Sequence, residues 1–336
     1  MPSSTALLLA SSSTPSTTSA AVLLPPPVHP IVHFFAGWLG ASLSCVLLSP
    51  LEVIKTRQQS AACGLRRGVR ADTLAREIWA AEGARGFYRG LIPHLLGVGP
   101  ARAFYFGGYA YAKRELGGPG GLTGPKLHLT AAALASIVSS SIMCPVWVIK
   151  VRLQLAGAPC GGEGGLTQQR PYKGVVDAFR RVYAEEGIGA FYRGLSASYL
   201  GVAETALQFA LYGELKDYVI QSRRNAAAIA SANAAAAHLP PPPPTPDYPD
   251  SIAFWTSAAA KLVAAVGTYP HEVLRTRMRE KGGSERYSGI IVTTRRILAE
   301  EGVRGLYGGM AVHLLRTVPN AAILLMVVEK ATGGKL

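Results

Sequence analysis

The sequence predicts an all-α membrane protein in which three pseudo-symmetric repeats each supply two transmembrane helices. Three observations predict this fold. The 336 residues are 49% hydrophobic and only 16% charged, whereas roughly a quarter of the residues in soluble domains are charged. A motif headed by proline occurs three times and closes a long apolar run each time. A second motif follows each copy downstream.

The proline motif places a cation five residues, and an arginine seven residues, after the proline. The copies are Pro50-Leu-Glu-Val-Ile-Lys55-Thr-Arg57, Pro145-Val-Trp-Val-Ile-Lys150-Val-Arg152 and Pro270-His-Glu-Val-Leu-Arg275-Thr-Arg277. The downstream motifs are Glu82-Gly83-Ala-Arg-Gly-Phe-Tyr88-Arg89-Gly90, Glu186-Gly187-Ile-Gly-Ala-Phe-Tyr192-Arg193-Gly194 and Glu301-Gly302-Val-Arg-Gly-Leu-Tyr307-Gly308-Gly309. Such self-similarity indicates one repeat architecture rather than independent domains.

Composition sets the expected boundaries of the repeats. The N-terminal stretch is rich in Ser, Thr and Pro and contains no Lys or Arg, so it resembles neither a signal peptide nor a transit peptide and is expected to be disordered. An alanine-rich run followed by five prolines is typical of a semi-rigid, exposed linker. The predicted organisation is a leader over 1–29, repeat 1 over 30–118, repeat 2 over 119–220, a linker over 221–250 and repeat 3 over 251–336.

Six apolar runs have the length, about 20 residues, that a helix needs to cross a bilayer. They cover approximately 31–50, 91–112, 127–149, 195–213, 251–270 and 310–328. Between the two runs of each repeat lies a short amphipathic stretch, which we expect to form a surface helix that ends at glycine. These stretches are 72–81, 175–185 and 290–300. Most Lys and Arg residues follow the first, third and fifth runs, which by the positive-inside rule face the more negative compartment.

Four ionisable residues fall inside the apolar runs, namely Arg102, Glu204, Lys261 and Arg316. Such residues are costly at membrane depth and therefore face the interior of the helix bundle. Glu204 either contributes to a substrate site or only pairs with a buried cation, but it cannot neutralise all three cations. Surplus cations favour an anionic solute, because arginine can bind a phosphate or carboxylate group through two hydrogen bonds.

Three residues at equal depth make the cavity asymmetric. Gly97, Gly201 and Arg316 each lie seven residues after the glycine that ends a downstream motif. Two glycines leave room for a flat ring to approach the backbone and the arginine offers charge, a combination that suits a nucleotide. Helix packing alone would also explain the glycines.

The proline motifs predict a ring of ion pairs where three kinked helices converge. An acid stands two residues after the proline in copies one and three, and the expected pairs are Glu52 with Lys150 and Glu272 with Lys55. Trp147 replaces the acid in copy two, which leaves Arg275 without its carboxylate. Partly solvated pairs of this kind contribute about 1 kcal/mol each, as a gate that must open requires; static structural bridges are the alternative.

On these motifs the chain resembles the mitochondrial carrier family over residues 31–329. The resemblance implies six tilted helices in pseudo-threefold symmetry, a central substrate site, salt-bridge gates on the matrix and cytosolic sides, and alternating access. The tryptophan in the second motif resembles the pattern of one branch of the family, which includes carriers of pyrimidine nucleotides, of NAD and of folate or FAD. The strings Gly99-Pro-Ala-Arg102-Ala-Phe-Tyr-Phe and Gly194-Leu-Ser-Ala-Ser-Tyr-Leu-Gly-Val-Ala-Glu204 favour the pyrimidine nucleotide carriers.

The resemblance also implies roles for single residues. The substrate contact points of the family fall on Gly97, Gly201 with Val202, and Arg316. The glutamines that brace the matrix gate fall on Gln59 and Gln154, whereas the third copy has Arg279.

The expected cytosolic gate departs from the family pattern. Its positions fall on Lys113, Lys216 and Glu329, and only Glu329 keeps the acid. At most one bridge, to Lys113, is expected, so this gate should be weak.

The sequence thus predicts an antiporter of pyrimidine (deoxy)nucleotides in the mitochondrial inner membrane, or else a carrier of NAD, FAD or folate. Its expected partners are nucleotides and the bilayer, with cardiolipin at the matrix ends of the helices, and it is expected to be a monomer without cofactor or metal. The net charge of +14 would also suit nucleic acid, but six apolar runs disfavour that class. No recognisable spacing of nucleophile, base and orienting group indicates an enzyme. Cys45 and His94 are interpreted as packing residues.

Overall fold

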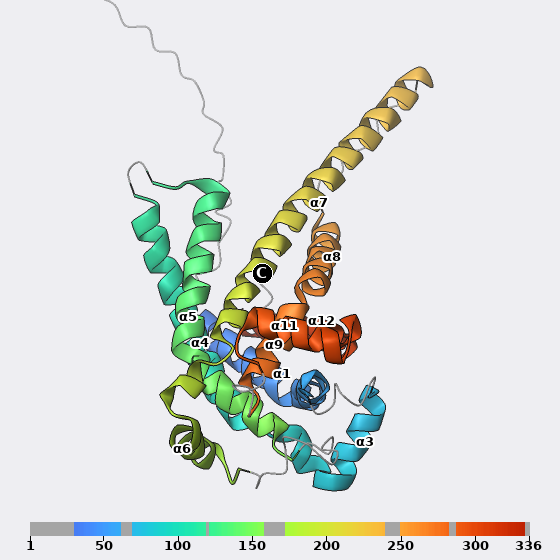
Figure 1. Cartoon of the computed structure of the whole chain (residues 1–336). Helices are drawn as coiled ribbons and strands as arrows, with labels where there is room; N and C mark the ends of the chain where they lie inside the picture. The colour runs from blue at the N-terminus through green and yellow to red at the C-terminus, as the bar shows by residue number, and fades with distance from the viewer. Residues whose placement is uncertain are drawn as a thin grey trace, which may run out of the picture.

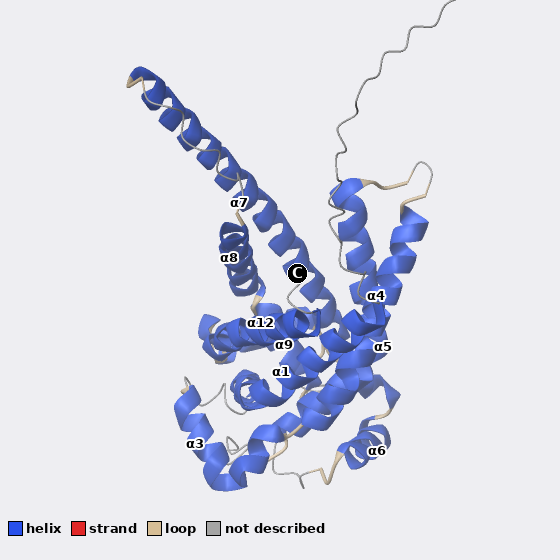
Figure 2. Cartoon of the chain, turned by 180° about the vertical axis from the view of Figure 1, so that it is seen from behind, coloured by secondary structure: helices blue, strands red, loops and turns tan. Residues whose placement is uncertain are grey.

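The computed structural model describes residues 30–61, 69–118, 121–157, 172–238, 249–281 and 287–332. Throughout these ranges the regular secondary structure is helical, with no strand, as Figure 2 shows. The predicted leader and the five consecutive prolines lie outside the described residues, so the predictions made for them stay predictions.

Each predicted span is contained wholly or largely in a long helix. The helices are α1 (Pro30–Gln59), α4 (Leu91–Leu116), α5 (Gly124–Leu155), α7 (Leu195–Ala236), α8 (Asp250–Thr268) with α9 (Pro270–Arg279), and α12 (Met310–Thr332). Pro50 and Pro145 lie inside α1 and α5, whereas Pro270 is the first residue of α9, and Tyr269 stands between α8 and α9. Proline lacks an N–H, so a helix hydrogen bond is missing at this place in every copy.

Two helices in the described part of the chain are long and apolar enough to cross a membrane by composition alone. They are Trp38–Gln59 and Lys126–Leu155. The other long helices include those that carry Arg102, Glu204, Lys261 and Arg316, and such charges lower the mean hydropathy of a span. The prediction of six spans therefore depends on the repeat and on the family reported below.

The amphipathic helices are confirmed in all three repeats. They are α3 (Ala71–Glu82), α6 (Val175–Glu186) and α11 (Ile290–Glu300). Each is followed by a short 3₁₀ helix, η1 (Gly83–Tyr88), η2 (Ile188–Tyr192) or η3 (Val303–Tyr307). Gly83, Gly187 and Gly302 turn the chain at these points with φ of 63°, 75° and 72°, a conformation that glycine adopts without a steric cost.

The helices pack in a cycle that follows the repeat. The second span of each repeat lies against the first span of the next, so α4 packs on α5, α7 on α8 and α9, and α12 on α1. Figure 1 and Figure 2 show the α4–α5 and α7–α8 pairs diverging from the end of the bundle where α3 and α6 lie. Buried apolar clusters fix that end, since each joins a motif helix to its amphipathic helix, as Val53 of α1 does with Leu74 and Ile78 of α3.

The predicted linker is partly wrong. Residues 221–236 form no irregular segment but continue α7 as a single helix of 42 residues, which projects beyond the rest of the bundle in Figure 1. Alanine has the highest helix propensity of all residues, so the alanine-rich run favours continuation of the helix. The prediction that this segment is exposed agrees with the structure, in which Ile229 is 62% exposed.

Candidate functional site

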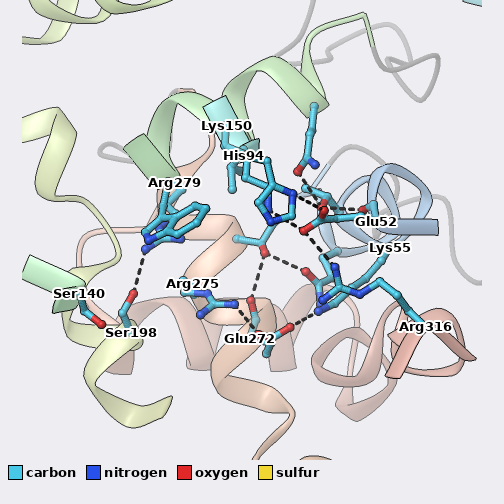
Figure 3. A pocket seen from close by; sticks show the side chains of 16 residues that line it. Glu52, Lys55, His94, Ser140, Lys150, Ser198, Glu272, Arg275, Arg279 and Arg316 are labelled. Atoms are coloured by element: carbon cyan, nitrogen blue, oxygen red, sulfur yellow. Dashed lines mark hydrogen bonds and ion pairs between the residues drawn. The ribbon is translucent and has the colours of Figure 1, made fainter. Parts of the chain in front are cut away.

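A polar cavity of about 290 Å³ lies where the three proline motifs converge. The motif helices α1, α5 and α9 supply most of its wall, and α4, α7 and α12 complete it. Among the described residues that line it are five cations but only two carboxylates, drawn in Figure 3. They are Lys55, Lys150, Arg275, Arg279 and Arg316, with Glu52 and Glu272. The cavity therefore carries a surplus of positive charge.

The structure contains both ion pairs expected from the sequence. Glu52 Oε1 lies 2.6 Å from Lys150 Nζ, and Glu272 is paired with Lys55. The four side chains are only 8–13% exposed, so these pairs are buried rather than partly solvated as expected. Removing one partner of a buried pair costs about 3–5 kcal/mol, because the other charge is left uncompensated. Both carboxylates are therefore held firmly in this closed arrangement.

The third position of the ring contains Trp147, whose ring centroid lies 5.2 Å from Lys150 Nζ. That distance allows a cation–π contact. The expectation for Arg275 needs correction, because its guanidinium pairs with Glu272 one turn away on the same helix. Glu272 thus serves two cations, Lys55 on α1 and Arg275 on α9. In the described residues no carboxylate of α5 takes the place of the missing acid.

Two histidines missed as site residues contact the ion pairs. His94 Nδ1 lies 2.9 Å from Glu52 Oε2, and His313 Nδ1 lies 2.8 Å from Lys55 Nζ. The interpretation of His94 as a mere packing residue is wrong, although its ring does stand edge-on to Trp147. Both histidines follow the last glycine of a downstream motif by four residues. This shared position in two repeats was the signal that could have identified them.

A second ring, the lower ring, lies below the ion pairs and is built by the arginines seven residues after each proline. Each donates from Nε to a backbone carbonyl of the next motif helix, Arg57 to Gln154 at 3.0 Å, Arg152 to Arg279 at 3.2 Å and Arg277 to Gln59. These hydrogen bonds connect the three repeats in a closed cycle. They position the ring of ion pairs above them.

The acid that opens each downstream motif neutralises the arginine of its own repeat. The pairs are Arg57 with Glu82, Arg152 with Glu186 and Arg277 with Glu301. Burial raises the pKa of Glu186, but hydrogen bonds and charge from Arg152 and from Arg193 hold that pKa below its ordinary value. The sequence displayed these acids at constant spacing, yet no partner was assigned to them.

Gln59 and Gln154 lie in the wall directly below the ion pairs. Gln59 accepts a hydrogen bond from Thr276 at 2.8 Å and donates to the Tyr269 hydroxyl at 2.9 Å. Gln154 accepts from Thr56 at 3.1 Å. Both glutamines thus join two motif helices, as a brace would.

Tyr269 offers a test of this network, because its hydroxyl accepts from Gln59 and donates to the Gly308 carbonyl at 2.8 Å. We expect Tyr269→Phe to lower the free energy of unfolding in detergent by about 1–3 kcal/mol, since buried polar groups lose their partners. Tyr307→Phe is the matched control. Its ring stacks 6.1 Å from that of Tyr269, but its hydroxyl makes no hydrogen bond in the described structure. Equal unfolding temperatures for the two variants would contradict the role of the hydroxyl.

Arg316 and Arg102 come together at an adjoining cavity of about 280 Å³. Arg316 Nη1 lies 3.1 Å from Glu52 Oε1 and also reaches the first cavity. Glu52, His94 and Trp147 line both cavities. Arg316 therefore lies at the boundary between the ion-pair ring and the adjoining cavity.

Other predicted contact residues do not line these two cavities. A Cβ atom on Gly97 would lie 3.1 Å from Val146 Cγ1, and one on Gly201 would lie 3.3 Å from His271 Nε2. Both glycines thus accommodate side chains of the next motif helix, which supports the packing explanation. Val202 follows Gly201 on α7 and is half-buried.

Glu204 lies 2.6 Å from Lys261 and joins α7 to α8. Of the two readings left open for Glu204, the structure therefore favours pairing with a cation. Of the four ionisable residues predicted inside the apolar runs, Glu204 and Lys261 thus pair with each other, and the other two are Arg102 and Arg316.

The expected cytosolic gate is only partly described. Lys113 is exposed near the end of α4, Lys216 lies on α7, and the side chain of Glu329 lies outside the described residues. The single bridge predicted there stays a prediction. Of the cysteines, Cys144 is fully buried, whereas Cys45 Sγ lies 3.4 Å from His94 Nε2. Cys63 and Cys160 also lie outside the described residues, and no group of metal-binding side chains occurs in the part that was described.

The cycle of helices, the buried ring and the cavity define a helical bundle of three repeats around a cationic cavity. The family model for mitochondrial carrier protein matches residues 26–119, 124–223 and 249–333. The chain therefore belongs to the mitochondrial carrier family, whose members are transporters rather than enzymes.

Named relatives align with most of the chain. Solute carrier family 25 member 36 of Mus musculus is 33% identical over 317 residues, covering 89% of this chain and 96% of that protein. Solute carrier family 25 member 33 of Homo sapiens is 34% identical over 325 residues, covering 89% and 93%. Mitochondrial carrier protein rim2 of Schizosaccharomyces pombe is 33% identical over 324 residues, covering 88% and 87%.

Proposed function

We propose that this protein exchanges pyrimidine nucleotides across the mitochondrial inner membrane by alternating access. The observation that carries the proposal is the central cavity, in which five cations face two carboxylates. A nucleotide supplies the missing negative charge through its phosphates. The named relatives and the motif strings quoted above support this branch of the family.

The ion-pair ring fits the role of the matrix gate. Its side chains lie at the end of the bundle where the amphipathic helices pack, and Glu52 and Glu272 together engage cations of α1, α5, α9 and α12. A phosphate bound to Arg316 would compete with Glu52 for its guanidinium. Substrate binding would in this way weaken the ring and favour its opening.

The surroundings of the protein follow from the same proposal. Its spans face the lipid bilayer of the inner membrane, and cardiolipin is the expected lipid at the matrix ends of the helices. The proposed transport unit is a monomer, in which the residues lining the cavity all come from one chain. The neighbouring candidate function is transport of NAD, FAD or folate, which the tryptophan motif also permits.

A competition assay in proteoliposomes separates these substrates. We expect unlabelled CTP and TTP to suppress uptake of labelled UTP, because all three present a triphosphate and a pyrimidine to the same cavity. NAD and folate should suppress it much less at equal concentration. Protein that exchanges NAD or folate but none of the three pyrimidine nucleotides would overturn the proposal.

A further inference from the structure

Arg279 is a buried cation for which the described part of the chain supplies no ion pair. Arg279 is 5% exposed, and its Nε has no hydrogen-bond partner among the described residues. Nη2 donates to the Ser198 hydroxyl at 2.9 Å, and the Cys144 thiol lies beside the guanidinium. Leaving a charge buried and unneutralised costs several kcal/mol. A site of this kind calls for an anion.

The position of Arg279 concentrates positive charge on one side of the cavity. Arg275 and Arg279 are one turn apart on α9, so both point to the same face of the helix, and like charges in this arrangement repel. Both line the cavity (Figure 3). Arg275 shares Glu272 with Lys55, and Arg279 forms no ion pair with either carboxylate that lines the cavity in the described structure.

Arg279 stands where the other two repeats have Gln59 and Gln154, and the second proline motif, which lines the same cavity, lacks its acid. The corresponding acids of the other two motifs, Glu52 and Glu272, are both engaged by other cations. Trp147 stands in the wall instead of a carboxylate. The hydroxyl of Ser140, also in the wall, adds a donor suited to phosphate oxygen.

We propose that Arg279, with Arg275 and Ser140, forms a subsite for the distal phosphates of the transported nucleotide, while Ser198 holds the Arg279 guanidinium in place. This inference rests on the proposed function and deepens it, because it assigns recognition of phosphate number to one residue. Arg316 binds the part of the phosphate chain nearer the sugar, at the entrance to the ring. The outer phosphates then compete with Glu272 for Arg275, as the inner part of the phosphate chain competes with Glu52 for Arg316.

The natural substitution for a test is Arg279→Gln, because Gln59 and Gln154 occupy the equivalent positions of the other repeats. The backbone carbonyl that accepts from Arg152 stays in place. Arg304→Gln is the matched control, since Arg304 is exposed and lies outside the cavity. Arg279→Lys keeps the charge and should restore part of the effect.

The measurement is the ratio of the KM for UMP to the KM for UTP in proteoliposome exchange. We expect Arg279→Gln to lower this ratio at least about tenfold, as truncating one partner of a buried charge pair does, and Arg304→Gln to leave it unchanged. A purely structural role for Arg279 would change transport of both nucleotides alike. An unchanged ratio in Arg279→Gln would overturn the subsite.

A second readout does not depend on transport or on the base. Purified protein in detergent is heated with inorganic tripolyphosphate or inorganic phosphate, and the unfolding temperature is recorded. We expect tripolyphosphate to raise the unfolding temperature of the wild type and of Arg304→Gln more than that of Arg279→Gln. If Arg279→Gln does not fold, Arg279→Lys replaces it in this comparison. Equal stabilisation of all variants, or none of the wild type, would overturn the subsite. A wild type that is stabilised but carries no pyrimidine nucleotide would refute the proposed function alone.

Discussion

Replacement of Arg316 by alanine is expected to abolish nucleotide exchange while leaving a folded, membrane-inserted protein. The guanidinium lines both cavities and lies 3.1 Å from Glu52. Its loss removes the cation placed to receive the phosphate chain, and we expect UTP uptake to fall by more than about 30-fold. Glu52 retains Lys150 and His94 as partners, so the closed ring should persist.

Two variants sharpen this test. Arg316→Lys keeps the charge but not the paired donors, so it should recover only part of the uptake. Arg304→Ala removes an exposed arginine and should transport as the wild type does. Undiminished UTP uptake by Arg316→Ala would discredit the assignment of Arg316 to the substrate site.

Arg277→Ala should have the largest effect on stability of any single change in the lower ring. The Arg277 side chain is 1% exposed and pairs with Glu301 at 2.8 Å, while its Nε donates to the Gln59 carbonyl. Truncation leaves Glu301 buried without its cation, which costs about 3–5 kcal/mol. The expected result is a much lower unfolding temperature in detergent, with poor recovery of folded protein.

Arg296→Ala is the matched control for that measurement. Arg296 also pairs with a glutamate, Glu300, at 2.8 Å, but this pair lies on the exposed face of α11. Such a surface pair contributes no more than about 1 kcal/mol. If Arg277→Ala and Arg296→Ala unfolded at the same temperature, the lower ring would not be what holds the motif helices together.

Sequence patterns were sufficient for features that recur in every repeat. The surface helices and their terminal glycines follow from periodicity, and the pairing of Glu52 with Lys150 follows from the spacing in the motif. The burial of these pairs did not follow, because solvation depends on how the third helix packs. The alanine-rich run was misread for a simpler reason, since its helix propensity outweighed the proline tract that follows it.

Features that occur in one or two repeats were harder to predict. The position that His94 shares with His313 marks it as a site candidate, but its contact with Glu52 depends on how α4 packs against α1. Arg275 pairs with Glu272 of its own helix, because Trp147 occupies the position of the acid on the neighbouring helix α5. The sequence shows Arg279 only as a departure from glutamine, whereas the structure places it in the cavity wall without an ion pair among the described residues.

Uptake of labelled UTP into loaded and empty proteoliposomes tests the central claim most directly. Alternating access with obligatory exchange predicts rapid uptake by the wild-type protein when the vesicles contain CTP or UTP. It predicts little uptake when the vesicles are empty or contain NAD. Equal uptake into empty vesicles, or uptake that only internal NAD supports, would contradict a pyrimidine nucleotide antiporter built around this cavity.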